Sequence, residues 1–120
     1  MSKTKIDDIC QVQCFNTDLV AQLRDNLPSE ETLEEMTIVF GVLADRLRVK
    51  ILHALKNGEE LCVCDIASML NVKIATASHH LRKMRDLKLV KYRNEGKLAY
   101  YSINDRRATD IINYYLQELI

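Results

Sequence analysis

The chain has 120 residues, of which 48% are apolar, and its 17 basic and 17 acidic side chains cancel to a net charge of zero. This length suits one domain, and a domain this small buries a modest share of its surface, so a second subunit is expected to contribute to its stability. No apolar run reaches the roughly 20 residues of a membrane helix, and the first residues lack the apolar core of a signal peptide. We therefore expect a cytoplasmic protein that does not enter a membrane.

The zero net charge conceals a strong segregation of charge along the chain. Residues 1–40 hold three basic and eight acidic side chains, whereas residues 71–97 hold eight basic and two acidic ones. The second segment therefore carries a net charge of +6. A basic segment inside a neutral chain is a candidate phosphate-binding surface.

The first 57 residues follow a helical pattern in which polar residues mark the helix ends. Residues 1–15 are expected to be a flexible arm that carries two cysteines, and residues 16–120 to be the DNA-binding and dimerisation domain. Asn16 or Thr17 can begin a first helix, which Pro28 stops, while Ser29 and Asp45 can begin a second and a third. Gly58 is expected to end the third helix. The inner face of the second helix is expected to contain Leu33, Met36, Val39, Phe40 and Leu43.

The second half of the chain has the pattern of a winged helix-turn-helix. Helical patterns at about 62–70 and 75–87 are separated by the turn Asn71-Val72-Lys73, a spacing typical of a helix-turn-helix. Two β-rich runs then flank residues 94–97, which predicts a hairpin with Gly96 at a positive φ. The last helix follows Asp105 and is apolar on more than one face, so one face is available to a second subunit. The predicted fold is mainly α with a small β-hairpin, and dimeric.

The second helix of a helix-turn-helix lies in the major groove of DNA. In the segment from Ile74 to Leu87, the apolar stripe Ile74, Ala77, Leu81, Met84 and Leu87 is expected to be buried. Short polar side chains near the start of that helix can reach base edges, and cations there and on the wing can bind phosphates. The residues expected to contact double-stranded DNA are Lys73, Thr76, Ser78, His79, Arg82, Arg93 and Lys97. The alternative for this segment is a solvated basic helix face.

The four cysteines form two pairs, Cys10 with Cys14 and Cys62 with Cys64. In an intracellular chain, such pairs indicate metal or redox chemistry more than a disulfide scaffold. Four thiolates suit a tetrahedral or trigonal site for Zn²⁺, Cd²⁺ or Pb²⁺ and not one for magnesium or calcium. A switch based on thiol oxidation and a purely structural zinc site are the two alternatives.

Three segments carry a resemblance to a known family: ELCVCDIASMLNV (60–72), ASHHLRKM (77–84) and NEGKLAYYSI (94–103). They resemble the ArsR/SmtB family of winged-helix metal-sensing repressors, and with the arm cysteines the chain is most similar to its CadC and AztR-type cadmium, lead and zinc sensors. The resemblance implies an apo homodimer on the operator DNA of a metal-efflux operon, which metal binding releases. It also implies a metal site formed by Cys62 and Cys64 together with Cys10 and Cys14 from the arm of the other subunit.

The chain departs from two other sites that occur in this family. Arsenite sensors carry a third cysteine soon after the cysteine box, here Cys62-Val63-Cys64-Asp65, and residues 66–69 of this chain contain none. The zinc site on the last helix of some relatives is incomplete, because Asp105 matches its first ligand while Arg107 and Glu118 replace others. The resemblance therefore leaves the cysteine site as the sensor. An enzyme is not expected, because no glycine-rich phosphate loop, Ser/His/Asp set or pair of catalytic carboxylates is recognisable.

Overall fold

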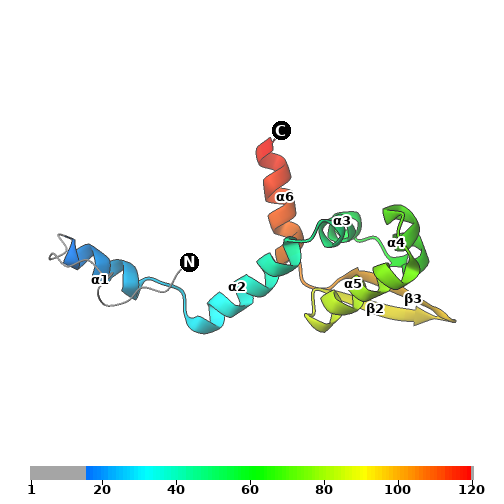
Figure 1. Cartoon of the computed structure of the whole chain (residues 1–120), viewed down its shortest axis with the longest axis horizontal. Coiled ribbons are helices and arrows are strands. Elements are labelled where there is room, and N and C mark those ends of the chain that lie inside the picture. Colours follow the sequence, from blue (N-terminus) through cyan, green and yellow to red (C-terminus); the bar gives the residue numbers. More distant parts are fainter. Residues whose placement is uncertain (1–15, 120) are drawn as a thin grey trace. The chain divides into compact units, whose positions relative to one another are not determined.

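The computed structural model describes residues 16–119 and divides the chain into two compact units, Met1–Leu33 and Glu34–Ile120. The elements in chain order are α1 (Thr17–Asp25), α2 (Glu30–Leu43), α3 (Arg46–Leu55), β1 (Leu61–Cys62), α4 (Val63–Leu70), α5 (Ile74–Asp86), β2 (Val90–Glu95), β3 (Leu98–Ile103) and α6 (Arg107–Leu119) (Figure 1). Among residues 16–119, no helix has the length and apolar content needed to cross a lipid bilayer. The predicted arm, residues 1–15, lies outside the described residues.

Side-chain caps fix the helix boundaries close to where the sequence predicts them. The Ser29 hydroxyl accepts a hydrogen bond from the Thr32 backbone N–H at 3.1 Å before α2. The Asp45 carboxylate accepts from the Leu47 and Arg48 backbone N–H groups at 2.8 and 3.2 Å, which caps α3. After α3, Gly58 has a φ of 87° and its N–H donates to the Leu55 carbonyl at 3.2 Å. These caps confirm the predicted starts of α2 and α3 and the predicted end of α3.

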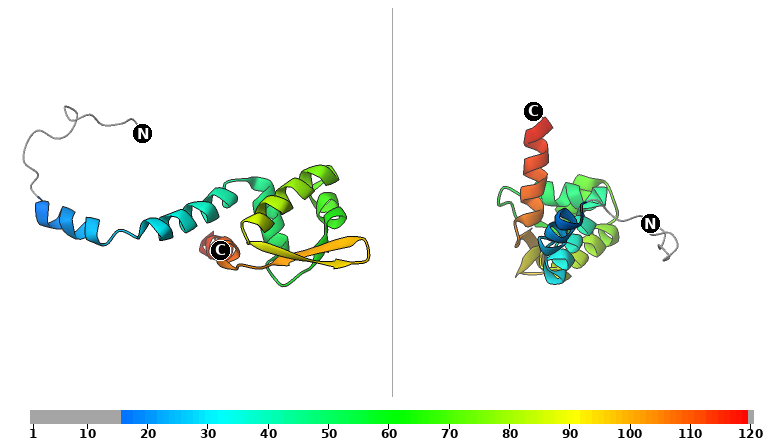
Figure 2. Two further views of the ribbon diagram at one scale, coloured as in Figure 1. Left: turned by 90° about the horizontal axis from the view of Figure 1, so that it is seen from below. Right: turned by 90° about the vertical axis from the view of Figure 1, so that its left-hand side faces the viewer.

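α4 and α5 form the predicted helix-turn-helix, which two views of the ribbon show (Figure 2). α4 ends at Leu70, and its C-cap residue Asn71 is left-handed, with a φ of 57° and a ψ of 49°. The Val72 N–H closes the turn on the Ala67 carbonyl at 3.0 Å. Asparagine tolerates this conformation better than most residues, which explains its place at this turn. α5 then begins at Ile74, within one residue of its predicted start.

The wing is part of a three-stranded antiparallel sheet with the order β1-β3-β2. β2 pairs with β3 from Val90↔Ile103 to Glu95↔Leu98, so the hairpin loop is Gly96-Lys97, and Gly96 has the predicted positive φ at 62°. The sequence does not predict β1, which pairs Leu61 with Tyr101 and Cys62 with Tyr100. The sheet and helices confirm the predicted fold class, a mainly α winged helix-turn-helix.

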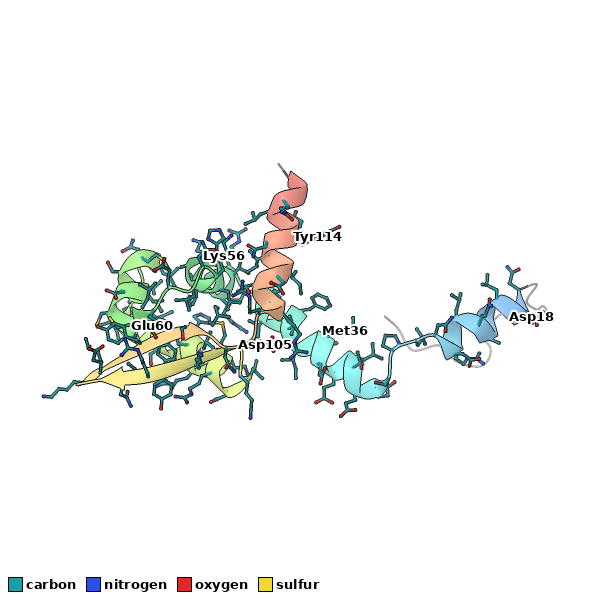
Figure 3. The ribbon with its side chains drawn as sticks, turned by 180° about the vertical axis from the view of Figure 1, so that it is seen from behind. Asp18, Met36, Lys56, Glu60, Asp105 and Tyr114 are labelled. Carbon is teal, nitrogen blue, oxygen red and sulfur yellow. The ribbon has the colours of Figure 1, made fainter. Side chains whose placement is uncertain are left out.

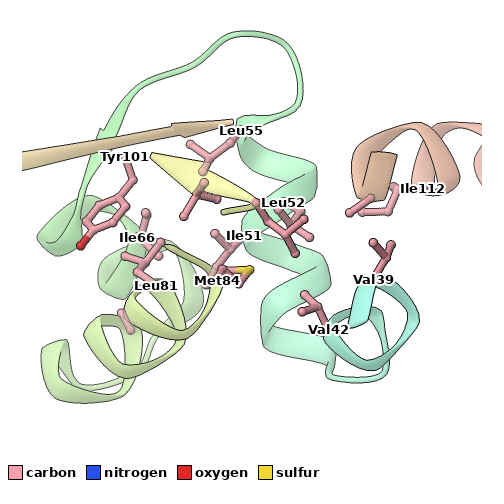
Figure 4. Packing of buried hydrophobic residues seen from close by; sticks show 14 of the residues in the cluster. Val39, Val42, Ile51, Leu52, Leu55, Ile66, Leu81, Met84, Tyr101 and Ile112 are labelled. Atoms are coloured by element: carbon pink, nitrogen blue, oxygen red, sulfur yellow. The ribbon is translucent and has the colours of Figure 1, made fainter. Parts of the chain in front are cut away.

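The hydrophobic core of the second unit joins α2, α3, α4, α5, the sheet and α6 (Figure 4). Its fully buried side chains include Val42, Ile51, Leu52, Leu55, Ile66, Leu81, Met84 and Leu89. The prediction for the inner face of α2 is partly wrong, because Met36 and Phe40 are exposed while Val39 and Val42 are buried. Helical spacing identifies an apolar face, but it does not tell which of two apolar faces the domain covers.

Hydrogen bonds tie the end of the recognition helix to the start of α6. Lys88, in the turn after α5, has a left-handed φ of 66°, and its carbonyl accepts from the Asn104 amide at 2.9 Å. The Leu89 carbonyl accepts from the backbone N–H groups of Asn104 and Asp105 at 2.9 and 3.1 Å. These hydrogen bonds connect the turn after α5 directly to the turn before α6.

Candidate DNA-binding surface and cysteine site

The recognition helix α5 buries one face and exposes another. Ala77, Leu81 and Met84 are fully buried, as the sequence predicts. On the other side, Lys73, His79 and Arg82 are exposed and Thr76 and Ser78 are half-buried. Lys73 is the N-cap residue of α5, Thr76, Ser78 and His79 lie in the first two turns of the helix, and Arg82 lies in the third. This arrangement suits base contacts from the N-terminal turns and phosphate contacts from the cations.

Ile74 does not belong to the buried stripe in which the sequence places it. It is 55% exposed, because it is the first residue of α5 and precedes the part of the helix that the core covers. Sequence reasoning missed it as a surface residue, since its spacing to Ala77 and Leu81 fits the buried face. An exposed apolar side chain at the start of a recognition helix is available to contact a thymine methyl group in the major groove.

The two predicted wing cations have different surroundings. Lys97 is exposed in the hairpin loop. Arg93 forms ion pairs with Glu60 at 2.9 Å and with Glu95 at 3.0 Å, and its guanidinium lies over the Tyr100 ring at 5.1 Å from the ring centre. The hydrogen bonds from Arg93 lower the pKa of the Glu60 carboxyl, and the same bonds raise the pKa of Arg93 above its ordinary value. No local sequence pattern indicates the Glu60 partner, which lies 33 residues earlier.

The cysteine box lies where β1 meets α4, the first helix of the helix-turn-helix. Cys62 ends β1 and is the N-cap residue of α4, and its N–H donates to the Asp65 carboxylate at 3.4 Å. Its side chain is 7% exposed, whereas Cys64, in the first turn of α4, is exposed. Both are free thiols. The strand-to-helix junction therefore presents one sheltered and one accessible thiol.

These two cysteines fit a thiophilic metal ion as half of a ligand set. Within residues 16–119, no three His, Cys, Asp or Glu side chains are grouped so that they could hold a metal ion. The other two predicted ligands, Cys10 and Cys14, lie outside the described residues. Two soft thiol donors at the box favour zinc, cadmium or lead over magnesium or calcium, and such an ion needs at least one further ligand from elsewhere.

Asp105 already has structural partners at the base of α6. Its carboxylate accepts from the Arg107 backbone N–H at 2.9 Å and pairs with the Arg107 guanidinium at 2.6 Å. These bonds lower the pKa of the Asp105 carboxyl, and the side-chain hydrogen bond from Arg107 is the main cause. Asp105 therefore bonds to the first turn of α6 and pairs with Arg107, the residue at which the family resemblance leads one to expect a histidine.

Comparisons with known proteins agree with this arrangement. The model for bacterial regulatory proteins of the ArsR family matches residues 45–92. The CadC homolog of Staphylococcus aureus, a cadmium resistance transcriptional regulatory protein, is 40% identical over 88% of this chain and 86% of its own length. The SmtB homolog of Synechocystis, a transcriptional repressor, is 34% identical over 86% of this chain and 77% of its own length.

A solved structure supports the same assignment. It is a homodimeric winged helix-turn-helix DNA-binding domain from Mycobacterium bovis, which matches with a TM-score of 0.66 at 27% identity, over 78% of this chain and 89% of that one. Because the matched family consists of DNA-binding regulators, the prediction that the chain is not an enzyme is confirmed. With a relative of this similarity over most of its length, and with the helix pair and wing described above, the chain belongs to the ArsR/SmtB family of winged helix-turn-helix transcriptional repressors.

Proposed function

We propose that this repressor is a cytoplasmic homodimer that binds double-stranded operator DNA of a metal-resistance operon and leaves it when Zn²⁺, Cd²⁺ or Pb²⁺ binds. The metal ligands are Cys62 and Cys64 together with Cys10 and Cys14. The observation that carries the proposal is the position of the box at the start of α4, the helix that packs against the recognition helix α5. The name of the Staphylococcus aureus relative, a cadmium resistance regulator, supports cadmium as an effector.

The box is mechanically connected to both parts of the DNA-binding surface. Cys62 is paired with Tyr100 of β3, which in turn is paired with Arg93 of the wing. Ile66 and Ala67 of α4 are buried in the same core as Ala77 and Leu81 of α5. A change in the backbone at Cys62 therefore acts on the wing through the sheet and on α5 through the core. A coupling free energy of about 1–3 kcal/mol is enough to lower DNA affinity several-fold to about a hundredfold.

The exposed side of α6 provides the surface proposed for the second subunit. Tyr114 and Tyr115 of α6 are 66% and 64% exposed, and Figure 3 labels Tyr114. Ile111, Tyr115 and Leu116 border an apolar cavity of about 640 Å³ together with residues of α3 and α4. Such exposed apolar surface is typical of an interface between subunits. A homodimer also presents two recognition helices to successive major-groove half-sites.

A cadmium titration of the single variants Cys10→Ser, Cys14→Ser, Cys62→Ser and Cys64→Ser tests the ligand set. We expect sulfur-to-metal charge-transfer absorption that weakens in each variant whose cysteine binds the ion. We also expect Cys62→Ser and Cys64→Ser to bind DNA as the wild type does without metal and to stay bound when cadmium is added. Metal-driven release that survives in both of these variants would contradict the proposal.

The redox alternative is favoured by one observation, the exposure of the Cys64 thiol, which leaves it accessible to an oxidant. Peroxide treatment of the metal-free protein, with DNA binding as the readout, separates the two functions. We expect peroxide to be ineffective at concentrations that leave the fold intact. Loss of DNA binding with peroxide, reversed by a thiol reductant and independent of metal, would favour redox sensing.

A further inference from the structure

The wing arginine, Arg93, is held by two carboxylates in a fork-like arrangement. Its Nε donates to both Glu60 carboxylate oxygens at 3.1 Å, and its Nη2 donates to Glu60 Oε1 at 2.9 Å. Its Nη1 donates to Glu95 Oε1 at 3.0 Å. Each nitrogen of the guanidinium therefore already donates to a carboxylate. Two negative charges surround one positive charge, so Arg93, Glu60 and Glu95 together carry a charge of −1.

Glu60 reaches Arg93 from a different part of the chain. It lies in the loop that leads from α3 into β1, two residues before Cys62 (Figure 3). Arg93 and Cys62 are both register partners of Tyr100, so the three residues form one row across the sheet. The guanidinium lies over the Tyr100 ring, and this contact holds it on the same face of the sheet. The ion pair between Glu60 and Arg93 therefore connects the segment that carries the cysteine box to the wing.

Arg93 cannot bind Glu60 and a DNA phosphate with the same N–H groups. Arginine binds carboxylate and phosphate groups through the same planar fork, Nε and one Nη, and Glu60 occupies that fork here. Glu95 uses only Nη1 and is two residues along the same strand. A phosphate that approaches the wing therefore has to displace Glu60 before it gains a bidentate contact through the Nε/Nη2 fork.

We propose that Glu60 is an internal competitor for Arg93 that lowers the affinity of this repressor for DNA. In the free protein, Glu60 holds Arg93 over Tyr100, and in the complex a backbone phosphate replaces the Glu60 carboxylate. Release of Glu60 also frees the loop that precedes Cys62, so the exchange takes place beside the cysteine box. The inference rests on the DNA-binding part of the proposed function and not on the identity of the metal.

The test compares Glu60→Gln with Glu59→Gln in the full-length, metal-free protein. Glu59 is an exposed neighbour, so its substitution removes the same charge one residue away and serves as the matched control. The probe is a duplex that the metal-free wild type selects from a random-sequence pool, and binding is followed by fluorescence anisotropy over a series of salt concentrations. We expect Glu60→Gln to bind about two- to fivefold more tightly than the wild type, in line with an exposed ion pair.

The Arg93→Gln background shows whether the gain passes through Arg93. Because a phosphate replaces Glu60 in the wild-type complex as well, Glu60→Gln should change the slope of log affinity against log salt by less than the roughly 0.9 of one whole phosphate contact. Arg93→Gln removes that contact, so its slope should be shallower than that of the wild type by about 0.9. In the Arg93→Gln background, Glu60→Gln should no longer tighten binding. Thermal unfolding of every variant confirms that the compared proteins are folded.

Three results would overturn the inference. If Glu59→Gln and Glu60→Gln tighten DNA binding equally, the gain comes from the loss of a negative charge in this loop and not from competition for Arg93. A gain that persists without Arg93 would show that Glu60 acts elsewhere. Weaker DNA binding by Glu60→Gln would show that Glu60 positions Arg93 for DNA. Cadmium-driven release of the wild type from the same duplex is scored separately, so failure of the metal-sensing proposal is distinguishable from failure of this one.

Discussion

Lys88 adopts the left-handed backbone conformation, with a φ of 66°, in the turn between the recognition helix and the wing. A residue with a side chain loses roughly 1–2 kcal/mol of folding free energy in this conformation. Glycine avoids this cost, but its larger conformational entropy in the unfolded chain offsets part of the gain. We expect Lys88→Gly to raise the free energy of unfolding by about 0.5–1 kcal/mol, measured by urea denaturation. Lys83→Gly, at an exposed position within α5, is the control and should lower it by about 1 kcal/mol. Destabilisation by both substitutions would show that the turn gains nothing from glycine.

Asp105 makes the stability of the protein depend on pH. Hydrogen bonds from Arg107 lower the pKa of the Asp105 carboxyl in the native state below its unfolded value. Arg107 also forms an ion pair with Glu35 at 3.4 Å. The stabilisation is therefore complete above the unfolded pKa of about 3.9 and is lost as the pH falls through the lower native pKa. We expect Asp105→Asn to be less stable than the wild type at pH 7 and the difference to shrink below about pH 4. Asp105→Asn is also measured in an Arg107→Gln background. If it still lowers the stability there by the same amount and with the same pH dependence, a group other than Arg107 lowers the pKa of Asp105.

At the scale of single elements, the start of α5 allows base and phosphate contacts to be separated. Ile74 is exposed and apolar, while Lys73, the N-cap residue, is exposed and cationic. We expect Ile74→Ala to weaken binding to the selected duplex several-fold with an unchanged salt slope and unchanged binding to an unrelated duplex. Lys73→Ala should weaken binding to both duplexes and make the salt slope shallower by about 0.9 for each phosphate that the lysine neutralises. Equal weakening on both duplexes for Ile74→Ala would remove it from base recognition.

The helix boundaries could be predicted from the sequence because their signals are local. Ser29 and Asp45 cap their own helices by bonds to backbone groups two or three residues away, and Gly58 and Gly96 occupy positions that favour glycine. β1 could not be predicted, because a two-residue strand has no periodicity and exists only through its pairing with β3.

The candidate site was predictable to the extent that its residues are close in sequence. Cys62 lies at the predicted start of α4, because the helix pattern and the cysteine box overlap. The exposure of Ile74 was missed, since spacing alone does not show how far neighbouring elements cover a helix. The Glu60 partner of Arg93 was missed because ion pairs between distant segments depend on the tertiary fold. The contribution of Cys10 and Cys14 lies outside the described residues and stays a prediction.

At the scale of the whole molecule, dimerisation is proposed to depend on the exposed side of α6. We expect Tyr114→Glu combined with Tyr115→Glu to shift the protein from dimer to monomer in sedimentation experiments, because each change places a charge in an apolar interface. Gln117→Glu, an exposed polar position on the same helix, is the control and should stay dimeric. DNA affinity should fall with the loss of the dimer. A double variant that sediments as a dimer would exclude this face.

The central proposal is a coupling between the cysteine site and DNA binding, and it is reciprocal, so DNA must weaken metal binding by the same factor. The most direct measurement is the dissociation constant of the wild-type protein for the selected duplex, by fluorescence anisotropy, with and without saturating cadmium. We expect saturating cadmium to raise the dissociation constant of the wild type at least about tenfold, equivalent to about 1.4 kcal/mol. The dissociation constant of Cys64→Ser should not change when cadmium is added. A wild-type dissociation constant that cadmium leaves unchanged, while absorption shows thiolate-bound metal, would contradict the coupling.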